Sequence, residues 1–177
     1  MVSISQKFEL GAPSFERRLQ AAARAQKAGY PVRIRPDPIV PVPGWKEQYA
    51  ETIRRIFEAV SPERITLGTL RFEPGFSRDL ITTGDALLGM MERVKPMFPP
   101  MEVPNPRKPG KTKTSTGKDS FPEDERVELF QFAIAEIRNY SDCRIALCKE
   151  SARVWERVGL RLSRYSCVCQ LDCANMG

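Results

Sequence analysis

Histidine is absent from this chain of 177 residues. Because histidine is the commonest general base and a frequent metal ligand, its absence excludes Ser-His and Cys-His nucleophilic pairs and most hydrolase classes. The chain also lacks a run of about 18 apolar residues and a signal peptide with a basic start and an apolar core. We therefore expect a soluble, cytoplasmic protein with no membrane partner.

The five cysteines are an odd number, and all lie between Cys143 and Cys173. This argues against a secreted disulfide framework and for metal, redox or packing roles. Four thiols are enough for a tetrahedral zinc or iron–sulfur site, and the candidate ligands are Cys148, Cys167, Cys169 and Cys173. The spacing of the last three, C-x-C-x3-C, matches no strong metal signature, so reduced thiols without metal are the alternative.

With 41% hydrophobic residues and a formal charge of +6, the chain suits one domain with a polyanionic partner such as DNA. Apolar residues at helical spacing predict helices over Ser14–Ala28, Trp45–Val60 and Ser77–Lys95. Alternating or compact apolar runs predict strands over Tyr30–Val40 and Arg64–Arg71. Strands separated by helices of this length imply a parallel sheet with helical crossovers, as in half of a TIM-type barrel.

The composition divides the chain into three parts. Residues 1–95 carry the predicted βα units, and residues 96–119 form a proline-rich, basic loop or linker with no apolar period. Residues 120–177 form an α/β extension. Its predicted parts are a helix capped by Ser120, a strand over Cys143–Cys148, a helix over Glu150–Val158, and a cysteine-rich tail.

Several short motifs in the first part of the chain resemble those of one enzyme family. They are Phe8–Ala22 (FELGAPSFERRLQAA), Ala28–Tyr30 (AGY), Asp37–Ile39 (DPI) and Gly44–Trp45 (GW). Together they resemble the second half of the catalytic barrel of spore photoproduct lyase and related radical S-adenosylmethionine proteins. The resemblance extends from Ser3 to Phe72, with a looser match from Lys111 to Lys149.

The resemblance implies a DNA-repair lyase that uses S-adenosylmethionine and a 4Fe-4S cluster. Members of that family hold the cluster with a CxxxCxxC motif, and no such spacing occurs in this sequence. We therefore expect the chain to be a carboxyl-terminal portion that is inactive alone. Activity would require an amino-terminal radical S-adenosylmethionine half, on the same or a separate chain, so whether this chain is itself an enzyme stays open.

The resemblance also suggests contacts with the cofactor. Ser3 is equivalent to a family serine that contacts S-adenosylmethionine, although Ser5 is an alternative and either can be an ordinary strand residue. Glu9 can accept hydrogen bonds from ribose hydroxyls or bond to nearby backbone. Arg71 and Phe72 match an Arg-Phe pair of the family at the end of a strand.

Charged residues on the predicted inward face of a barrel indicate a ligand, because the reactive centre of such a fold lies at the carboxyl ends of its strands. Arg33, Arg35 and Asp37 alternate in this way along the first predicted strand. An unpaired buried guanidinium costs several kcal/mol. The alternative is therefore that Arg35 and Asp37 pair with each other or that this face is open to water.

The basic loop corresponds to a family segment that faces the DNA lesion. Its lysines can neutralise phosphates or simply form a solvated loop, and they are Lys108, Lys111, Lys113 and Lys118. The tyrosines that support the family's radical relay are missing between Lys111 and Phe121. Two other functions therefore stay open: a non-catalytic nucleic-acid-binding module, and a degenerate remnant with exposed sheet edges.

Overall fold

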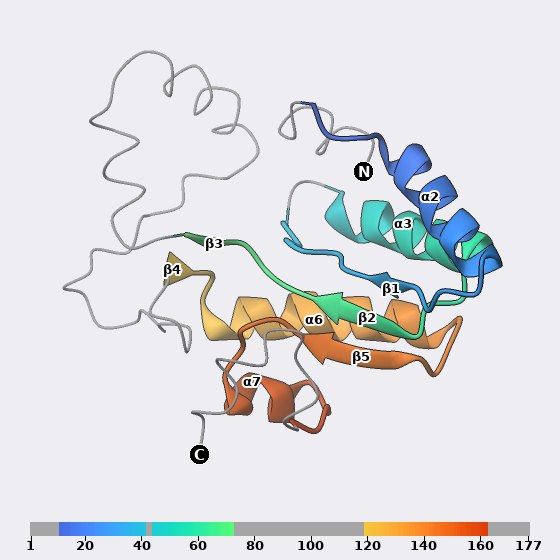
Figure 1. Ribbon diagram of the computed structural model, residues 1–177. Helices are drawn as coiled ribbons and strands as arrows, with labels where there is room; N and C mark the ends of the chain where they lie inside the picture. The colour runs from blue at the N-terminus through green and yellow to red at the C-terminus, as the bar shows by residue number, and fades with distance from the viewer. Residues whose placement is uncertain (1–10, 42–43, 73–118, 163–177) are drawn as a thin grey trace, which may run out of the picture.

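The structure is a computed structural model that describes residues 11–41, 44–72 and 119–162 (Figure 1). Its elements in chain order are α2 (Phe15–Lys27), β1 (Arg33–Ile34), α3 (Trp45–Ala59), β2 (Arg64–Leu67), β3 (Arg71–Phe72), β4 (Asp119–Ser120), α6 (Glu123–Arg138), β5 (Arg144–Leu147) and α7 (Ala152–Arg157). The predicted helix over Ser77–Lys95 and nearly all of the predicted linker lie outside the described residues.

The main sheet has three parallel strands, with β2 between β1 and β5. A separate antiparallel pair joins β3 to β4 and places Arg71 opposite Ser120. The α/β class and the parallel pairing of the first two predicted strands are thus confirmed. Three parallel strands do not establish the predicted half barrel.

Strand β5 comes from the part of the chain that was predicted to be an extension, yet it pairs with β2 along its whole length, from Arg144 opposite Arg64 to Leu147 opposite Leu67. Helices α3 and α6, from the same two parts, also pack together. The described portions of residues 1–95 and 120–177 therefore share one sheet and one core.

The ends of α2 follow the sequence signals. Ser14 caps the helix, because its Oγ accepts a hydrogen bond from the Arg17 backbone N–H at 3.3 Å. At the other end Gly29 has φ 87°, and the N–H groups of Gly29 and Tyr30 donate to the carbonyls of Gln26 and Ala25. This is a Schellman motif, which requires the left-handed backbone that glycine adopts most readily.

Two predicted strands are shorter in the structure. Tyr30–Val40 contains only β1, because Pro31, Pro36 and Pro38 have no N–H to donate to a ladder, and a single bridge between Ile39 and Thr69 continues the pairing. Arg64–Arg71 is divided into β2 and β3, which belong to different sheets.

The predicted cap of α6 is wrong. Ser120 lies in β4, and Pro122 occupies the cap position without a side-chain hydrogen bond. The Ser120 hydroxyl instead accepts a hydrogen bond from Arg126, so a tertiary contact replaces the expected local one.

The core lies between the sheet and helices α3 and α6 (Figure 1). Its central side chains are Ile65 and Leu67 of β2, Ile145 and Leu147 of β5, Tyr49 and Ile53 of α3, and Phe130 and Ile137 of α6. A second cluster, with Leu19 and Ile56 in it, joins α2 to α3. Within the described part of the chain, no helix has the length and apolar character needed to cross a bilayer.

Candidate functional site at the carboxyl ends of the strands

Four side chains with reactive or charged groups meet where the parallel strands end. Arg35 and Asp37 follow β1, Arg71 begins β3 just beyond β2, and Cys148 follows β5. We call these four residues the carboxyl-edge cluster. They come together because the carboxyl ends of parallel strands share one edge of a sheet.

The Asp37 carboxylate is the centre of this cluster. Its Oδ2 accepts hydrogen bonds from Arg35 Nε at 2.9 Å and Arg35 Nη2 at 2.6 Å, and its Oδ1 lies 3.5 Å from Arg71 Nη2. The side chains of Asp37 and Arg71 are only 12% and 11% exposed, whereas that of Arg35 is 44% exposed. One buried carboxylate therefore binds two guanidiniums, one of which reaches solvent.

Cys148 closes the cluster from the β5 side. Its Sγ lies 2.8 Å from Arg35 Nη2 and 3.5 Å from Arg71 Nη2, and its backbone carbonyl accepts a hydrogen bond from Arg71 Nη1. Burial raises the pKa of the Cys148 thiol, and the two guanidiniums oppose that rise. With a neutral thiol, the cluster has a formal charge of +1.

Gly68 makes room for the Asp37 carboxylate. A Cβ at Gly68 would lie 2.3 Å from Asp37 Oδ1 and 2.5 Å from Asp37 Cγ, well inside contact distance. The glycine is needed for this close approach rather than for an unusual backbone angle. Backbone bonds fix the approach, since Gly68 N–H donates to Pro36 and Ile39 N–H donates to Gly68.

A second, fully buried ion pair lies beside the cluster. Arg126 of α6 and Glu150 after β5 are each 1% exposed, and Arg126 Nε lies 3.2 Å from Glu150 Oε2. Glu150 Oε1 is buried without a hydrogen-bond partner. Burial raises the pKa of the Glu150 carboxyl, although Arg126 and, more weakly, Arg71 favour its charged form.

These two groups of charges hold both strands of the β3–β4 pair. Arg71 of β3 binds Asp37 and the Cys148 carbonyl, while Arg126 donates to the hydroxyl of Ser120 in β4 at 3.1 Å and to the Phe121 carbonyl at 2.5 Å. The pair is thus attached to the carboxyl edge of the sheet from two sides.

The chemistry available here is recognition of an anionic group. Planar guanidiniums bind carboxylate or phosphate through two parallel hydrogen bonds, and Arg35 is exposed enough to contact a ligand. The Asp37 carboxylate can accept hydrogen bonds from hydroxyl or amino groups. The cluster therefore suits a ligand that carries both kinds of group.

Residues 2–77 match the family model of spore photoproduct lyase. Two solved structures of spore photoproduct lyase are also similar to this chain. A mutant form has a TM-score of 0.52 at 18% identity, and a form complexed with dinucleoside spore photoproduct has a TM-score of 0.49 at 20% identity. The likeness to the first supports the fold.

In both comparisons the similarity covers 77% of this chain but 38% of the solved lyase chain. The chain thus spans well under half the length of those lyases. No curated protein matches it. The resemblance to spore photoproduct lyase inferred from the sequence is confirmed over residues 2–77.

The structure brings together three of the candidate site residues: Arg35 and Asp37, suggested by the barrel argument, and Arg71, suggested by the lyase resemblance. The Arg35–Asp37 pair considered as an alternative forms, and Arg71 shares the same carboxylate. Arg33 is different, because it lies at the amino end of β1 and pairs with Glu63 at 3.0 Å. Cys148 is in the cluster, and no group of three potential metal ligands occurs among the described residues.

The remaining candidates lie outside the described residues. They are Ser3, Glu9, Lys108, Lys111, Lys113, Lys118, Cys167, Cys169 and Cys173. Their roles stay predictions.

Sequence reasoning missed Gly68, Arg126 and Glu150. Arg126 did leave a signal, because it lies on the helical stripe that continues through Phe130, Ala133 and Ile137, all of which are buried. A charged residue in an apolar stripe indicates a buried partner. Nothing local identifies Glu150 as that partner.

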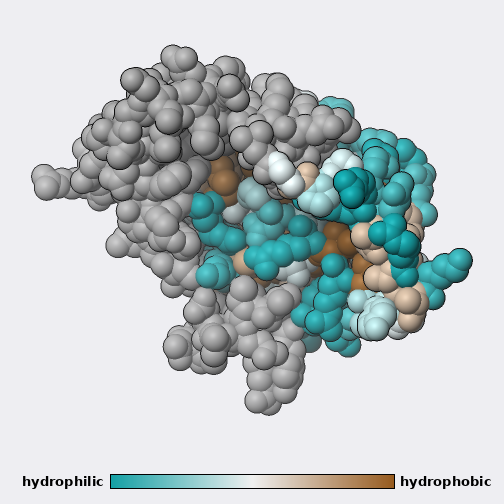
Figure 2. Space-filling view, turned by 45° about the horizontal axis from the view of Figure 1, so that its top comes forward, coloured by the Kyte–Doolittle hydropathy of each residue, from teal (hydrophilic) through white to brown (hydrophobic). Residues whose placement is uncertain are grey.

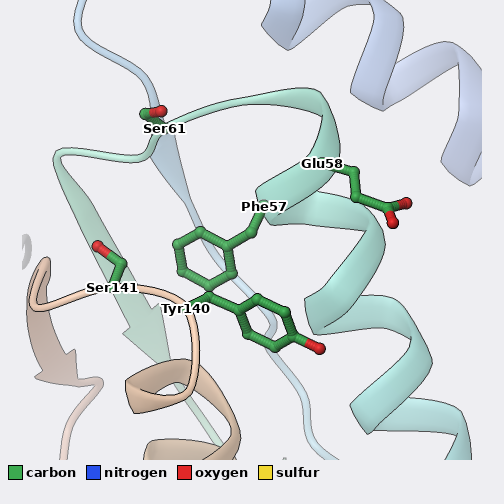
Figure 3. A pocket seen from close by; sticks show the side chains of 5 residues that line it. All are labelled: Phe57, Glu58, Ser61, Tyr140 and Ser141. Carbon is green, nitrogen blue, oxygen red and sulfur yellow. The ribbon is translucent and has the colours of Figure 1, made fainter.

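Two hollows lie away from this cluster. One of about 250 Å³ is lined by Phe57, Glu58, Ser61, Tyr140 and Ser141, from the segments that lead into the amino ends of β2 and β5 (Figure 3). Neither hollow is lined by a residue of the carboxyl-edge cluster.

We expect Gly68→Ala to lower the free energy of unfolding by about 1–3 kcal/mol, because the added methyl group collides with the Asp37 carboxylate. Asp37→Ala removes that collision, so the double variant should cost less than the sum of the two single variants by at least about 0.5 kcal/mol. Urea denaturation of the four proteins measures this coupling. Additive costs would contradict the packing of Gly68 against Asp37.

Glu150 should make stability depend on pH. Because its folded pKa is raised, the folded state binds more protons than the unfolded state, and stability is lost as pH rises from about 4.5 through the folded pKa. Glu150→Gln cannot ionise, so the stability of this variant relative to the unsubstituted protein should increase over that range. Urea midpoints measured from acid to neutral pH test this, and a difference that does not vary with pH would contradict it.

Proposed function

We propose that this chain is the carboxyl-terminal portion of a radical S-adenosylmethionine protein of the spore photoproduct lyase type, a DNA-repair family. The match of residues 2–77 to the family model is the observation that carries the proposal. The parallel sheet, with its polar cluster at the carboxyl edge, supports it as part of a TIM-type half barrel.

In this proposal the carboxyl-edge cluster contributes contacts to S-adenosylmethionine. The donor set fits the ligand: guanidiniums suit its carboxylate, and Asp37 suits its amino group or ribose hydroxyls. Ser3 and Glu9 are proposed as further contacts on the basis of the resemblance alone. When bound, S-adenosylmethionine supplies the radical chemistry, and the residues of this chain hold and orient it.

The described residues do not offer the ligand set of a 4Fe-4S cluster. The sequence has no CxxxCxxC motif, and the two described cysteines, Cys143 and Cys148, lie before and after β5 at its opposite ends. The thiol of Cys148 contacts the guanidiniums of Arg35 and Arg71. We therefore propose that the iron-binding part belongs to an amino-terminal half, on the same or another polypeptide, and that this chain is inactive alone.

Binding to DNA is a second candidate function, with or without catalysis. The β3–β4 pairing brings residues 72 and 119 together, so the two described residues that flank the segment with the basic lysines lie side by side, next to Arg71 of the carboxyl-edge cluster. A basic segment attached there is well placed for contacts with phosphate groups.

The proposal predicts that the chain binds S-adenosylmethionine through Arg35. In isothermal titration calorimetry, Arg35→Gln should weaken binding by about tenfold or more, because a charge-assisted hydrogen bond contributes about 1.5–3 kcal/mol. Arg33→Gln makes the same change two residues away, at the other end of β1, and should bind like the unsubstituted chain. Equal affinities for the two variants, or no binding by the unsubstituted chain, would contradict the proposed site.

The second candidate predicts a steep salt dependence for binding to duplex DNA. Replacing Lys111 and Lys113 by glutamine should lower the slope of log affinity against log salt by about 1.8, since each lost phosphate contact removes about 0.9. Fluorescence anisotropy at several salt concentrations measures this slope. An unchanged slope would remove these lysines from the interface.

A further inference from the structure

Three arginines form a row across the amino ends of the parallel strands. Arg33 of β1 is in register with Arg64 of β2, which is in register with Arg144 of β5. Residues in register on neighbouring strands point to the same face and lie about 4.8 Å apart. Like charges placed directly opposite each other destabilise a sheet, so this arginine row requires compensation.

Only part of this charge is compensated within the described chain. Arg33 donates to Glu63 at 3.0 Å, and this hydrogen bond, with the fields of Arg33, Arg64 and Arg144, holds the pKa of Glu63 below its ordinary value. In residues 11–41, 44–72 and 119–162, neither Arg64 nor Arg144 forms an ion pair. Two guanidiniums are therefore left for an external anion.

Two exposed aromatic rings lie at the same end of the sheet. Tyr30 and Tyr140, 67% and 46% exposed, are the large apolar side chains that the described residues leave most open to solvent. Tyr30 precedes Arg33 by three residues and Tyr140 precedes Arg144 by four, so each ring is attached within about 10–14 Å of the arginine row. We call the row and the two tyrosines together the amino-end rim.

The ring of Tyr140 is held in place by packing. It stacks on Phe57 with ring centroids 5.4 Å apart and planes 13° apart, at the edge of the hollow of about 250 Å³ (Figure 3). A ring that is fixed on one face and open on the other loses little entropy when a flat group stacks on it.

Hydrogen bonds also fix the loops of the rim. The Gln26 side chain donates to the Ser61 carbonyl at 2.7 Å and accepts from the Ser61 N–H at 3.0 Å, which ties α2 to the loop before β2. Arg138 donates to the carbonyls of Ser141 and Cys143, at 3.1 Å and 2.8 Å. The rim is therefore organised before any ligand arrives.

We propose that the amino-end rim binds single-stranded nucleic acid, with phosphates on the arginine row and bases on the two tyrosines. Basic side chains interleaved with exposed aromatic rings are the usual means of binding single strands without sequence preference. On the face drawn in Figure 2, most of the described residues are hydrophilic. Charge alone, however, does not distinguish a nucleic acid from other polyanions. The carboxylates of Glu58 and Asp142 also lie at this end, so base stacking has to contribute alongside charge.

This surface is separate from the carboxyl-edge cluster, since it lies at the opposite ends of the same strands. It also uses none of the lysines of the basic segment. Variants of the rim and of those lysines therefore distinguish the two interfaces.

The experiment is fluorescence anisotropy of the full chain with a labelled single-stranded oligonucleotide of about 12 nucleotides, within the site sizes usual for single-strand binding. Arg64→Gln combined with Arg144→Gln should lower the salt slope by about 1.4, at about 0.7 for each contact with a single strand. Arg17→Gln combined with Arg153→Gln removes the same charge from helices α2 and α7 and should leave the slope unchanged.

Tyr30 supplies the test of stacking, because its exposure makes substitution harmless to the core. Tyr30→Leu should weaken binding by about fivefold or more, whereas Tyr30→Phe keeps the ring and should retain affinity. Circular dichroism of each variant confirms that the fold is intact.

Three results would overturn the proposal. They are an unsubstituted chain that does not bind the oligonucleotide at low salt, rim variants that bind like the control pair, and competition by polyglutamate as effective as competition by the unlabelled oligonucleotide. The last result would show a surface for acidic proteins in place of a nucleic-acid surface.

Discussion

The Asp37 carboxylate, held between two guanidiniums and pressed against Gly68, is the interaction on which the carboxyl edge of this fold depends. It joins four segments that are far apart in the sequence: the loop after β1, the end of β2, the start of β3 and, through the arginines, the end of β5. A buried carboxylate is stable only when cations compensate it, and a second arginine is stable there only because that carboxylate is present. Each charge therefore lowers the free-energy cost of burying the others in the low-dielectric interior.

The buried Arg126–Glu150 pair extends the same principle toward α6. One arginine satisfies a carboxylate, a hydroxyl of β4 and a backbone carbonyl at once. The two arginines, Arg71 and Arg126, therefore fix a two-stranded ribbon that has too few residues to be stable alone. The unpartnered Glu150 oxygen is the one weak point in this network within the described residues.

The two ends of the parallel sheet differ in how they treat charge. At the carboxyl edge, the largely buried Asp37 and Arg71 pair with each other and with the more exposed Arg35, so positive and negative charges nearly neutralise each other. At the amino end, Arg33 and Arg144 are exposed and Arg64 is half-buried, all three are in register, and Glu63 pairs with Arg33. This contrast suits an organised ligand site at one end and a surface for an extended polyanion at the other.

The sequence by itself determined the local elements. Helical stripes, the Ser14 cap and the Gly29 terminus placed α2 and α3 correctly, because these signals depend on residues within one or two turns. Motifs in the first part of the chain also identified the family resemblance. The same sequence overestimated the length of the first strand, since apolar alternation continued through prolines that cannot pair.

Only the tertiary structure decided which distant residues meet. β5 belongs to the predicted extension, residues 120–177, and it pairs with β2 in the sheet, while apolar side chains of α6 and β5 join those of β2 in one core. This pairing brings Cys148 and Glu150 to the carboxyl edge. The need for glycine at position 68 follows from the position of Asp37 against it. The arginine row arises because three strands align in register. The sequence determines which side chains are charged. Long-range packing determines strand register and burial, and these decide whether a charge is paired or free.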